Sequence, residues 1–235
     1  MRQVLAGMLL VVALALAGCG GGSSSPSTSG NGEAAKPAQQ VLTDTVNAAD
    51  AATSLHLSGN ISGGGEQIGV DLRVAKNKGA TGTVTLNGST VQLIIIGSDA
   101  YIKADAKALQ ALAGTQGAAV APALANQWLK APTNDAKFQG ILAFSNPQSL
   151  FDQLKSGAGA NLKNNGVMTY KGQSAVALDD GAANGTLYVA ATGTPFPVAL
   201  VKTGTAGGAL TFSDWNKAVT LTAPSGAIDI SKLGG

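Results

Sequence analysis

The spacing of apolar residues changes along the chain from helical to alternating. Between Ala38 and Thr53 apolar residues recur at three- and four-residue steps, which predicts one amphipathic helix. From Leu55 to Ile102 apolar and polar residues alternate, and Asn87-Gly88 between two such runs is a signal for a type I′ hairpin. This part of the chain therefore predicts an antiparallel meander.

A block without charged residues follows between Ala108 and Leu129. Gly114, Gly117, Pro122 and several amides argue against a membrane span, and we expect Gly117 or Pro122 to split the block into two short helices. Because a surface helix normally carries a charged face, we expect the block to be buried or to pack over an apolar surface. Asn146-Pro147 predicts the start of a further helix, with asparagine as its N-cap.

Alternating runs return after Gly157, separated by turns rich in Gly, Asn and Asp. Strands on both sides of a helical insertion predict an α+β fold with one long antiparallel sheet. The strands expected here are Val167–Tyr170, Ser174–Leu178, Thr186–Ala190, Pro197–Val201, Leu210–Phe212 and Val219–Thr222.

The first apolar run of the chain ends at a cysteine. Val4–Leu16 has the length of a signal-peptide core and is too short to span a bilayer. Leu16-Ala17-Gly18-Cys19 resembles the bacterial lipobox, which implies a signal peptide over residues 1–18 and lipidation of the Cys19 thiol by diacylglycerol, with palmitate among its acyl chains. The alternative is an ordinary secretory peptide with an incidental cysteine.

The mature chain after the lipobox cleavage site has two parts of different composition. Residues 19–37 are rich in Gly and Ser and predict a flexible tether, and residues 38–235 are expected to form a single domain. With the anchor at Cys19, the protein is expected on the extracytoplasmic face of the cell membrane.

Composition narrows the classes of function. Charged residues make up 12% of the chain and its net charge is +2 without a basic run, so no nucleic-acid partner is expected. Cys19 is the only cysteine, which leaves no internal disulfide, and His56 is the only histidine, which excludes a two-histidine metal site. No phosphate-binding or dinucleotide motif occurs. We expect no metal, no cofactor and no enzymatic activity; an envelope hydrolase would first be sought at His56 with Asp71 or Ser174.

Seven short turn and strand motifs follow one another along the whole mature domain. They are Thr53–Leu57, Gly97–Tyr101, Gln127–Leu129, Tyr170–Gln173, Gly185–Val189, Pro195–Pro197 and Leu210–Trp215. Together with the lipobox and the tether, this order resembles the LppX/LprA/LprF/LprG group of actinobacterial envelope lipoproteins, which are related in fold to the LolA/LolB carriers.

The resemblance implies a curved half-barrel sheet with helices over its concave face. It also implies an apolar cavity that binds lipid or lipoglycan acyl chains for transfer across the envelope by a monomer. The alternative is a structural or interaction lipoprotein with a filled core and no ligand. The candidate cavity residues lie on the alternating strands and on the charge-free block: Val70, Leu72, Leu93, Ile95, Leu109, Leu112, Leu124 and Trp128.

The lipobox gives the first testable prediction. Cys19→Ala removes the only thiol that diacylglycerol could modify, so the variant is expected to leave the membrane fraction and appear in the soluble fraction. Fractionation and immunoblotting of washed membranes measure this. A variant that stays in washed membranes would contradict the predicted anchor.

Overall fold

The computed structural model describes residues 30–63, 65–117, 119–135, 142, 145–159, 161–181, 185–204 and 207–232. The predicted signal peptide, Cys19 and most of the tether lie outside the described residues. Among the residues that are described, no helix is long and apolar enough to cross a bilayer.

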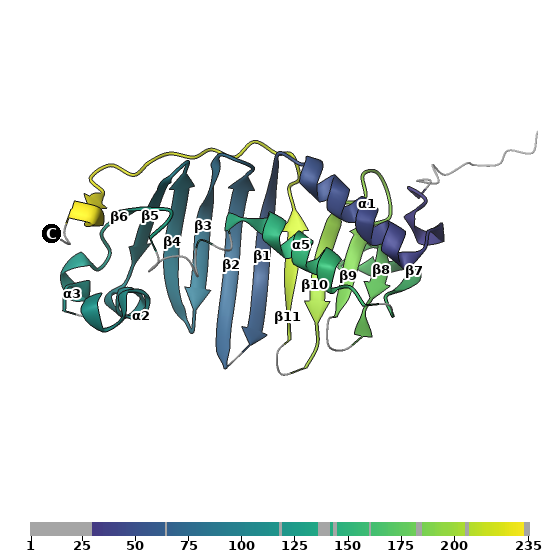
Figure 1. The fold of residues 1–235 in the computed structure, drawn as a ribbon, viewed down its shortest axis with the longest axis horizontal. Coiled ribbons are helices and arrows are strands. Elements are labelled where there is room, and N and C mark those ends of the chain that lie inside the picture. The colour runs from purple at the N-terminus through teal and green to yellow at the C-terminus, as the bar shows by residue number, and fades with distance from the viewer. Residues whose placement is uncertain are drawn as a thin grey trace, which may run out of the picture.

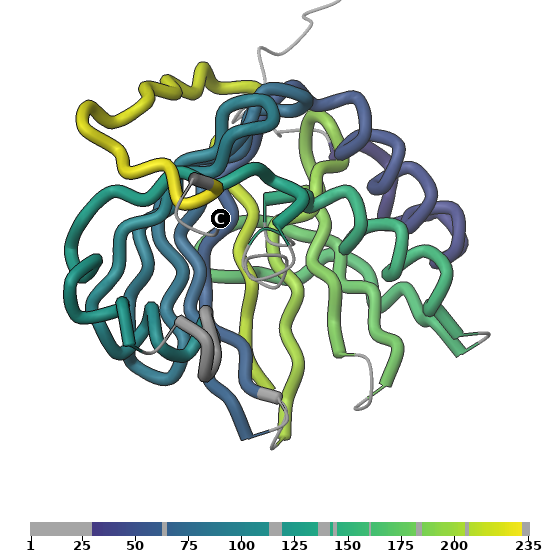
Figure 2. The backbone as a smooth tube through the Cα atoms, turned by 60° about the vertical axis from the view of Figure 1, so that its left-hand side comes forward, coloured from purple at the N-terminus to yellow at the C-terminus, as the bar shows by residue number. Residues whose placement is uncertain are grey.

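A single curved sheet forms the body of the molecule (Figures 1 and 2). Its strands follow the order β12-β6-β5-β4-β3-β2-β1-β11-β10-β9-β8-β7, and every pair is antiparallel except β12 with β6. The strands are β1 (Ser54–Gly63), β2 (Glu66–Ala75), β3 (Gly79–Leu86), β4 (Ser89–Ile96), β5 (Asp99–Ala104), β6 (Leu129–Pro132), β7 (Lys163–Tyr170), β8 (Gln173–Asp179), β9 (Thr186–Ala190), β10 (Pro197–Lys202), β11 (Gly208–Ser213) and β12 (Ile228–Asp229).

The helices lie on the concave face of this open sheet, as the resemblance implied (Figure 2). α1 and α5 contact each other over the part of the sheet that contains β9–β11, whereas α2 contacts β4 near the opposite end (Figure 1). The predicted α+β fold with a curved, mainly antiparallel sheet is thus confirmed. The helices are α1 (Ala38–Ala51), α2 (Ala106–Gly117), α3 (Ala121–Leu124) and α5 (Pro147–Gly157), with short 3-10 helices η1 (Glu33–Ala35) and η4 (Ile230–Lys232).

Rows of apolar side chains run across the strands on the concave face. Directly opposed residues of antiparallel strands point to the same face, so the register defines each row. The alternation in the sequence therefore becomes a continuous apolar surface. One row is Phe212, Leu57, Leu72, Gly82, Leu93, Ile102 and Leu129, and the next is Leu55, Val74, Ala80, Ile95, Ala100 and Ala131.

Gly82 interrupts the first row for a backbone reason. Its φ is +148°, and a Cβ at this position would lie 2.0 Å from the carbonyl oxygen of Asp71. Gly59 on β1 has the same constraint, with φ +145° and a Cβ position 2.0 Å from the carbonyl oxygen of Ala209. Glycine within a strand permits close backbone approach and local bending, so these positions favour the curvature of the sheet.

Most predicted elements agree with the structure, with two differences. Val219–Thr222 is not a strand: residues 214–227 pass along the ends of the strands, from β11 to β12 (Figure 1). Val219 and Leu221 are half-buried between exposed neighbours, so the alternation reflects packing on the rim of the sheet without a partner strand. Asn146 precedes α5 as expected, but its side chain makes no capping hydrogen bond.

The glycine geometry gives a second prediction. Gly82→Val is expected to lower the free energy of unfolding by about 1–3 kcal/mol, because a side chain there requires a strained φ and a backbone shift. Urea unfolding measures the change. Gly157→Ala is the control, since no atom lies within 4 Å of that Cβ position, and it should leave stability unchanged or slightly higher. Equal midpoints for Gly82→Val and the parent protein would show that β3 tolerates a side chain there.

Candidate functional site

An aromatic cluster fixes α5 against the sheet. Phe151 of α5 is 2% exposed, and its ring centroid lies 5.3 Å from that of Phe212 on β11 and 6.3 Å from that of Trp215. Trp215 also stacks on Phe196 at 4.6 Å, and its indole N–H donates to the carbonyl oxygen of Pro197. The apolar face of residues 147–157 therefore packs at one place on the sheet. This contact sets where α5 begins above the sheet.

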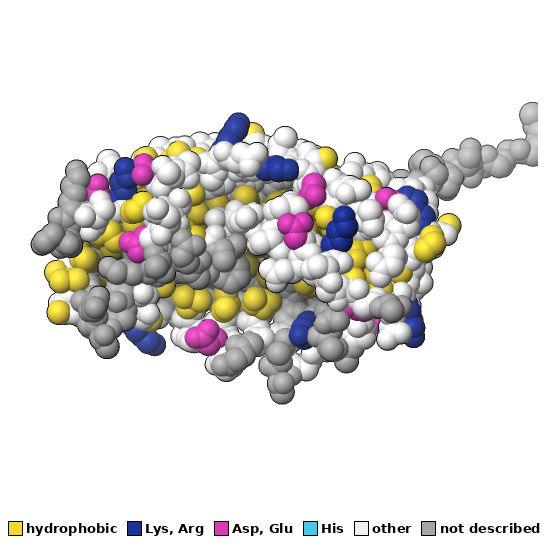
Figure 3. Space-filling model, in the orientation of Figure 1, with side chains coloured by type: hydrophobic (Ala, Val, Ile, Leu, Met, Phe, Trp, Pro, Cys, Tyr) yellow, Lys and Arg dark blue, Asp and Glu magenta, His cyan; other side chains and the backbone are white. Residues whose placement is uncertain are grey.

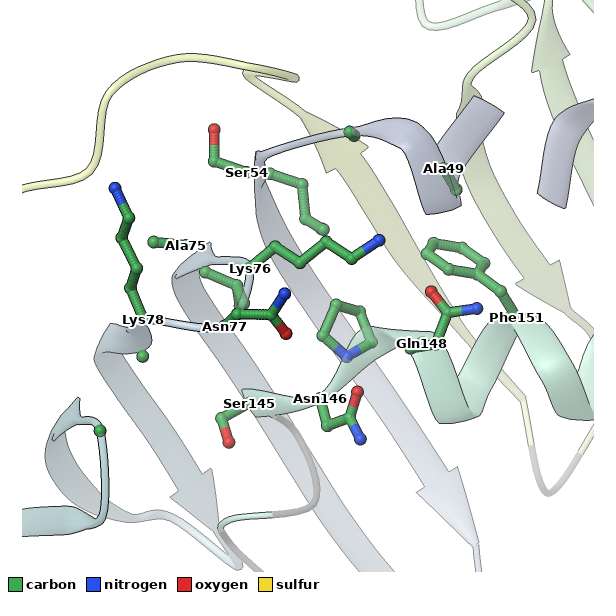
Figure 4. Close-up of a pocket in the computed structure, with 16 residues that line it drawn as sticks. Ala49, Ser54, Ala75, Lys76, Asn77, Lys78, Ser145, Asn146, Gln148 and Phe151 are labelled. Carbon is green, nitrogen blue, oxygen red and sulfur yellow. The ribbon is translucent and has the colours of Figure 1, made fainter. Parts of the chain in front are cut away.

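A cavity of about 440 Å³ opens beside the start of α5 (Figure 4). It lies between α5, the C-terminal end of α1 and the turns that join β2 to β3 and β4 to β5. Its wall has an apolar side and a polar side. The lining residues are Ala49, Ala52, Ser54, Leu55, Val74, Ala75, Lys76, Asn77, Lys78, Gly79, Gly97, Ser145, Asn146, Pro147, Gln148 and Phe151.

The apolar side continues the concave face of the sheet. Leu55 and Val74 are directly opposed residues of β1 and β2, and Ile95 lies in the same row, separated from Val74 by Ala80. Phe151 closes this side from above. Figure 3 shows hydrophobic side chains gathered on the viewed face over β2–β4, next to this region. The cavity therefore lies at one end of the apolar surface.

The polar side comes from the β2–β3 turn and the segment that leads into α5. The side chain of Lys76 crosses from the turn toward the end of α1, where its ammonium group donates to the carbonyl oxygen of Asp50 (Figure 4). The amides of Asn77 and Gln148 lie toward the cavity, whereas Lys78 points away from it (Figure 4). No carboxylate belongs to the lining among the described residues.

A second, smaller cavity of about 40 Å³ lies between α1, α5 and the strands β8–β10. Leu42 of α1 and Leu154 of α5 face Leu178 and Leu187 of the sheet across it. Its lining is mainly aliphatic. This cavity holds little free space between the helices and this half of the sheet.

Seven of the eight candidate residues predicted from the sequence belong to the hydrophobic core or pack against it, and Trp128 is the exception. Val70, Leu72, Leu93, Ile95 and Leu109 are at most 6% exposed and belong to one hydrophobic cluster. Leu112 and Leu124 pack against that cluster, and Trp128 is half-buried with the Lys103 ammonium group 6.0 Å from its ring centroid. None of them lines either cavity within the described part of the chain. That they contact a ligand stays a prediction.

The residues that line the larger cavity are not among those predicted from the sequence. Leu55 and Val74 could have been predicted to face the core, since they belong to the same alternation of apolar and polar residues as Leu72. Phe151 lies in the helix predicted to start at Asn146-Pro147, where it forms an apolar patch with Leu150 and Leu154. For residues 76–78 the sequence indicates a turn, but nothing in it predicts that they line a cavity.

The residues named for a hydrolase are only partly brought together. His56 Nε2 lies 2.7 Å from Asp71 Oδ1, and its Nδ1 lies 3.4 Å from the Ser213 hydroxyl. Ser174 is four strands away on β8, roughly 19 Å at about 4.8 Å per strand. His56 alternates with Leu55 and Leu57, so it points to the convex face, away from both cavities. Among the described residues no group of three potential ligands could hold a metal ion.

Polar contacts fix the start of the folded region. The Asn31 amide donates to the carbonyl oxygens of Ala190 and Gly193, and the Asn164 amide donates to that of Lys36. The Lys36 ammonium group lies 2.7 Å from both Glu33 and Asp44. Its hydrogen bond holds the pKa of the Asp44 carboxyl below the usual value, and those to Asp44 and Glu33 raise the pKa of Lys36. η1 is thereby attached to α1 and β7.

Comparison with known proteins shows a likeness in fold. No protein-family model and no curated protein sequence matches the chain. The structure of LprF from Mycobacterium bovis aligns with a TM-score of 0.52 and 17% identity, over 80% of this chain and 97% of that one. Lipoprotein LppX from Mycobacterium tuberculosis aligns with a TM-score of 0.51 and 18% identity, over 79% and 98%. The chain therefore has the fold of LprF and LppX, as the sequence resemblance implied.

Proposed function

We propose that this protein is a membrane-anchored carrier that binds the acyl chains of a lipid or lipoglycan between the sheet and the helices. The observation that supports this most directly is the cavity of about 440 Å³ at the end of the apolar sheet face. Ligand pockets commonly measure about 300–1,000 Å³ and combine an apolar lining with a few polar groups. The wall formed by Leu55, Val74 and Phe151 on one side and amides on the other has this character.

Acyl chains suit such a wall energetically. Each buried methylene contributes about 0.8 kcal/mol, so about ten methylenes contribute more than any single polar contact. The aliphatic and aromatic wall offers few directional groups. Binding would therefore depend on chain length more than on any one hydroxyl of the ligand.

The position of the tether supports exchange with a membrane. Asn31, close to the end of the predicted tether, is bonded to Ala190 at the end of β9. The register places this end of β9 at the same rim of the sheet as the start of β1 and Ser54, which lines the cavity. A Gly/Ser-rich segment of this length reaches on the order of 20 Å. With lipid on Cys19, this rim would stay close to the membrane surface.

A structural or interaction lipoprotein with a filled core is the second candidate. The observation that favours it is the tight packing of the deeper rows, where Leu72 and Leu93 are fully buried. The two candidates differ in whether the space beside Phe151 holds a ligand.

Lipid extraction with a blocked variant tests the proposal. The chain from Gly30 onward, which retains the Asn31 contacts, is expected to yield lipid on organic extraction and mass spectrometry. Ala49→Phe adds a ring at the wall of the cavity and should abolish bound lipid, with some loss of melting temperature because Ala49 is 6% exposed. Ala51→Phe is the matched control on the same helix, because Ala51 is exposed and outside the lining, and it should keep its lipid. Protein without lipid from both its native and a heterologous host would favour the filled core.

The deeper residues predicted from the sequence need a separate measurement. Leu93 is fully buried and Val70 is 5% exposed, so Trp at either position should cost roughly 1–3 kcal/mol of stability if the core is closely packed. If acyl chains reach these rows, the same substitutions should displace lipid while the melting temperature stays near that of the parent. Melting temperature and bound lipid measured on Leu93→Trp and Val70→Trp separate the two cases.

A further inference from the structure

Two of the lysines that form no ion pair among the described residues lie beside the larger cavity. Lys36, Lys130 and Lys217 each lie 2.6–2.8 Å from a carboxylate. Lys76 and Lys78 form no ion pair within the described chain, although both line the cavity. Two positive charges on one short turn thus remain without a protein counter-charge.

Three acidic residues, Asp50, Asp99 and Asp152, lie within two positions of a lining residue along the chain, but none of them lines the cavity. Asp99 on β5 forms an ion pair with Lys130 at 2.8 Å, and Asp152 accepts a hydrogen bond from Gln148 at 3.3 Å. Asp50 contacts Lys76 only through its main-chain carbonyl oxygen, and its carboxylate is not part of the lining. Among the described residues, the lining itself therefore carries two lysines and no carboxylate.

Hydrogen-bond donors accompany this charge. Asn77 and Asn146 contribute side-chain amides from the two opposing segments, and α5 begins here with the positive end of its dipole. The Asn146 side chain makes no capping hydrogen bond, so its amide is available to a ligand. A phosphate suits such donors, because it carries negative charge and several acceptor oxygens that can meet donors from more than one direction.

We infer that the cavity selects anionic lipids, with a phosphate-bearing headgroup between Lys76 and the start of α5 and the acyl chains against Leu55, Val74 and Phe151. This inference rests on the proposed function and adds a ligand class to it. Lys76 is the contacting cation, since its side chain crosses the cavity, whereas Lys78 points away and strengthens the local positive potential (Figure 4). The opposite sides of one cavity then match the two ends of one amphipathic ligand.

A competition experiment with matched lipids tests the inference. The full chain, lipidated and purified in detergent, is offered dioleoylphosphatidylglycerol and dioleoylglycerol, which share acyl chains and differ in the phosphate headgroup. A charge-assisted contact at a partly solvated site corresponds to about a tenfold preference for the phosphatidylglycerol. The Lys76→Gln, Lys78→Gln double variant should lose this preference and still bind dioleoylglycerol as the parent does.

Control variants and a soluble competitor complete the design. Lys155→Gln, Lys163→Gln removes the same number of charges from exposed sites outside the lining and should keep the preference. Glycerol phosphate has the anionic group without acyl chains and should not compete; if it competes at the lipid concentration, the site binds free phosphate and the lipid assignment is overturned. Equal binding of both lipids by the parent, or an unchanged preference in the double variant, overturns the inference alone. Absence of both lipids overturns the proposed function, and the inference with it.

Discussion

The antiparallel pairing of β1 with β11 is the contact on which the rest of the structure depends. It joins the meander β1–β6 to the strands β7–β11 and makes one sheet of them. Glycine lies on both sides of this seam: a Cβ on Gly59 or Gly208 would lie 2.0 Å or 2.3 Å from a carbonyl oxygen of the partner strand. Across the seam Leu57 is opposed to Phe212, so the apolar rows of the two halves run on without a break. The resulting concave face is wider than the helices that cover it, as Figure 1 shows.

The local structure of this fold could be predicted from the sequence, but its long-range pairing could not. Thr186–Ala190 is a strand with the predicted bounds, and Asn87 and Gly88 both have the positive φ that a type I′ turn needs. Alternation identifies a strand and its buried face, yet it does not say which strand lies beside it. The pairing of β1 with β11 and the parallel pair β12–β6 depend on contacts between distant residues. For the same reason the alternation around Val219 was misinterpreted as a strand.

The candidate site shows the same limit. The alternation placed Leu72 and Leu93 correctly on the buried face, and Leu55 and Val74 follow from the same pattern. Which part of that face stays unfilled depends on where α5 lies. The contact of Phe151 with Phe212 sets that position, and no spacing rule connects residues 61 positions apart in the chain. The sequence therefore predicts the apolar surface but not the location of the cavity on it.

The mixed lining of the cavity follows from the place where α5 begins. The first N–H groups of a helix have no partner within the helix, and burying them against apolar side chains would be unfavourable. α5 begins above the rim of the sheet, where Asn146 does not cap it and the polar β2–β3 turn lies opposite. Phe151, one turn further along, is pressed into the aromatic cluster. The polar start of α5 and its apolar face, a few residues further along, therefore line the same cavity. A ligand with a polar head and apolar chains would match both parts of this lining.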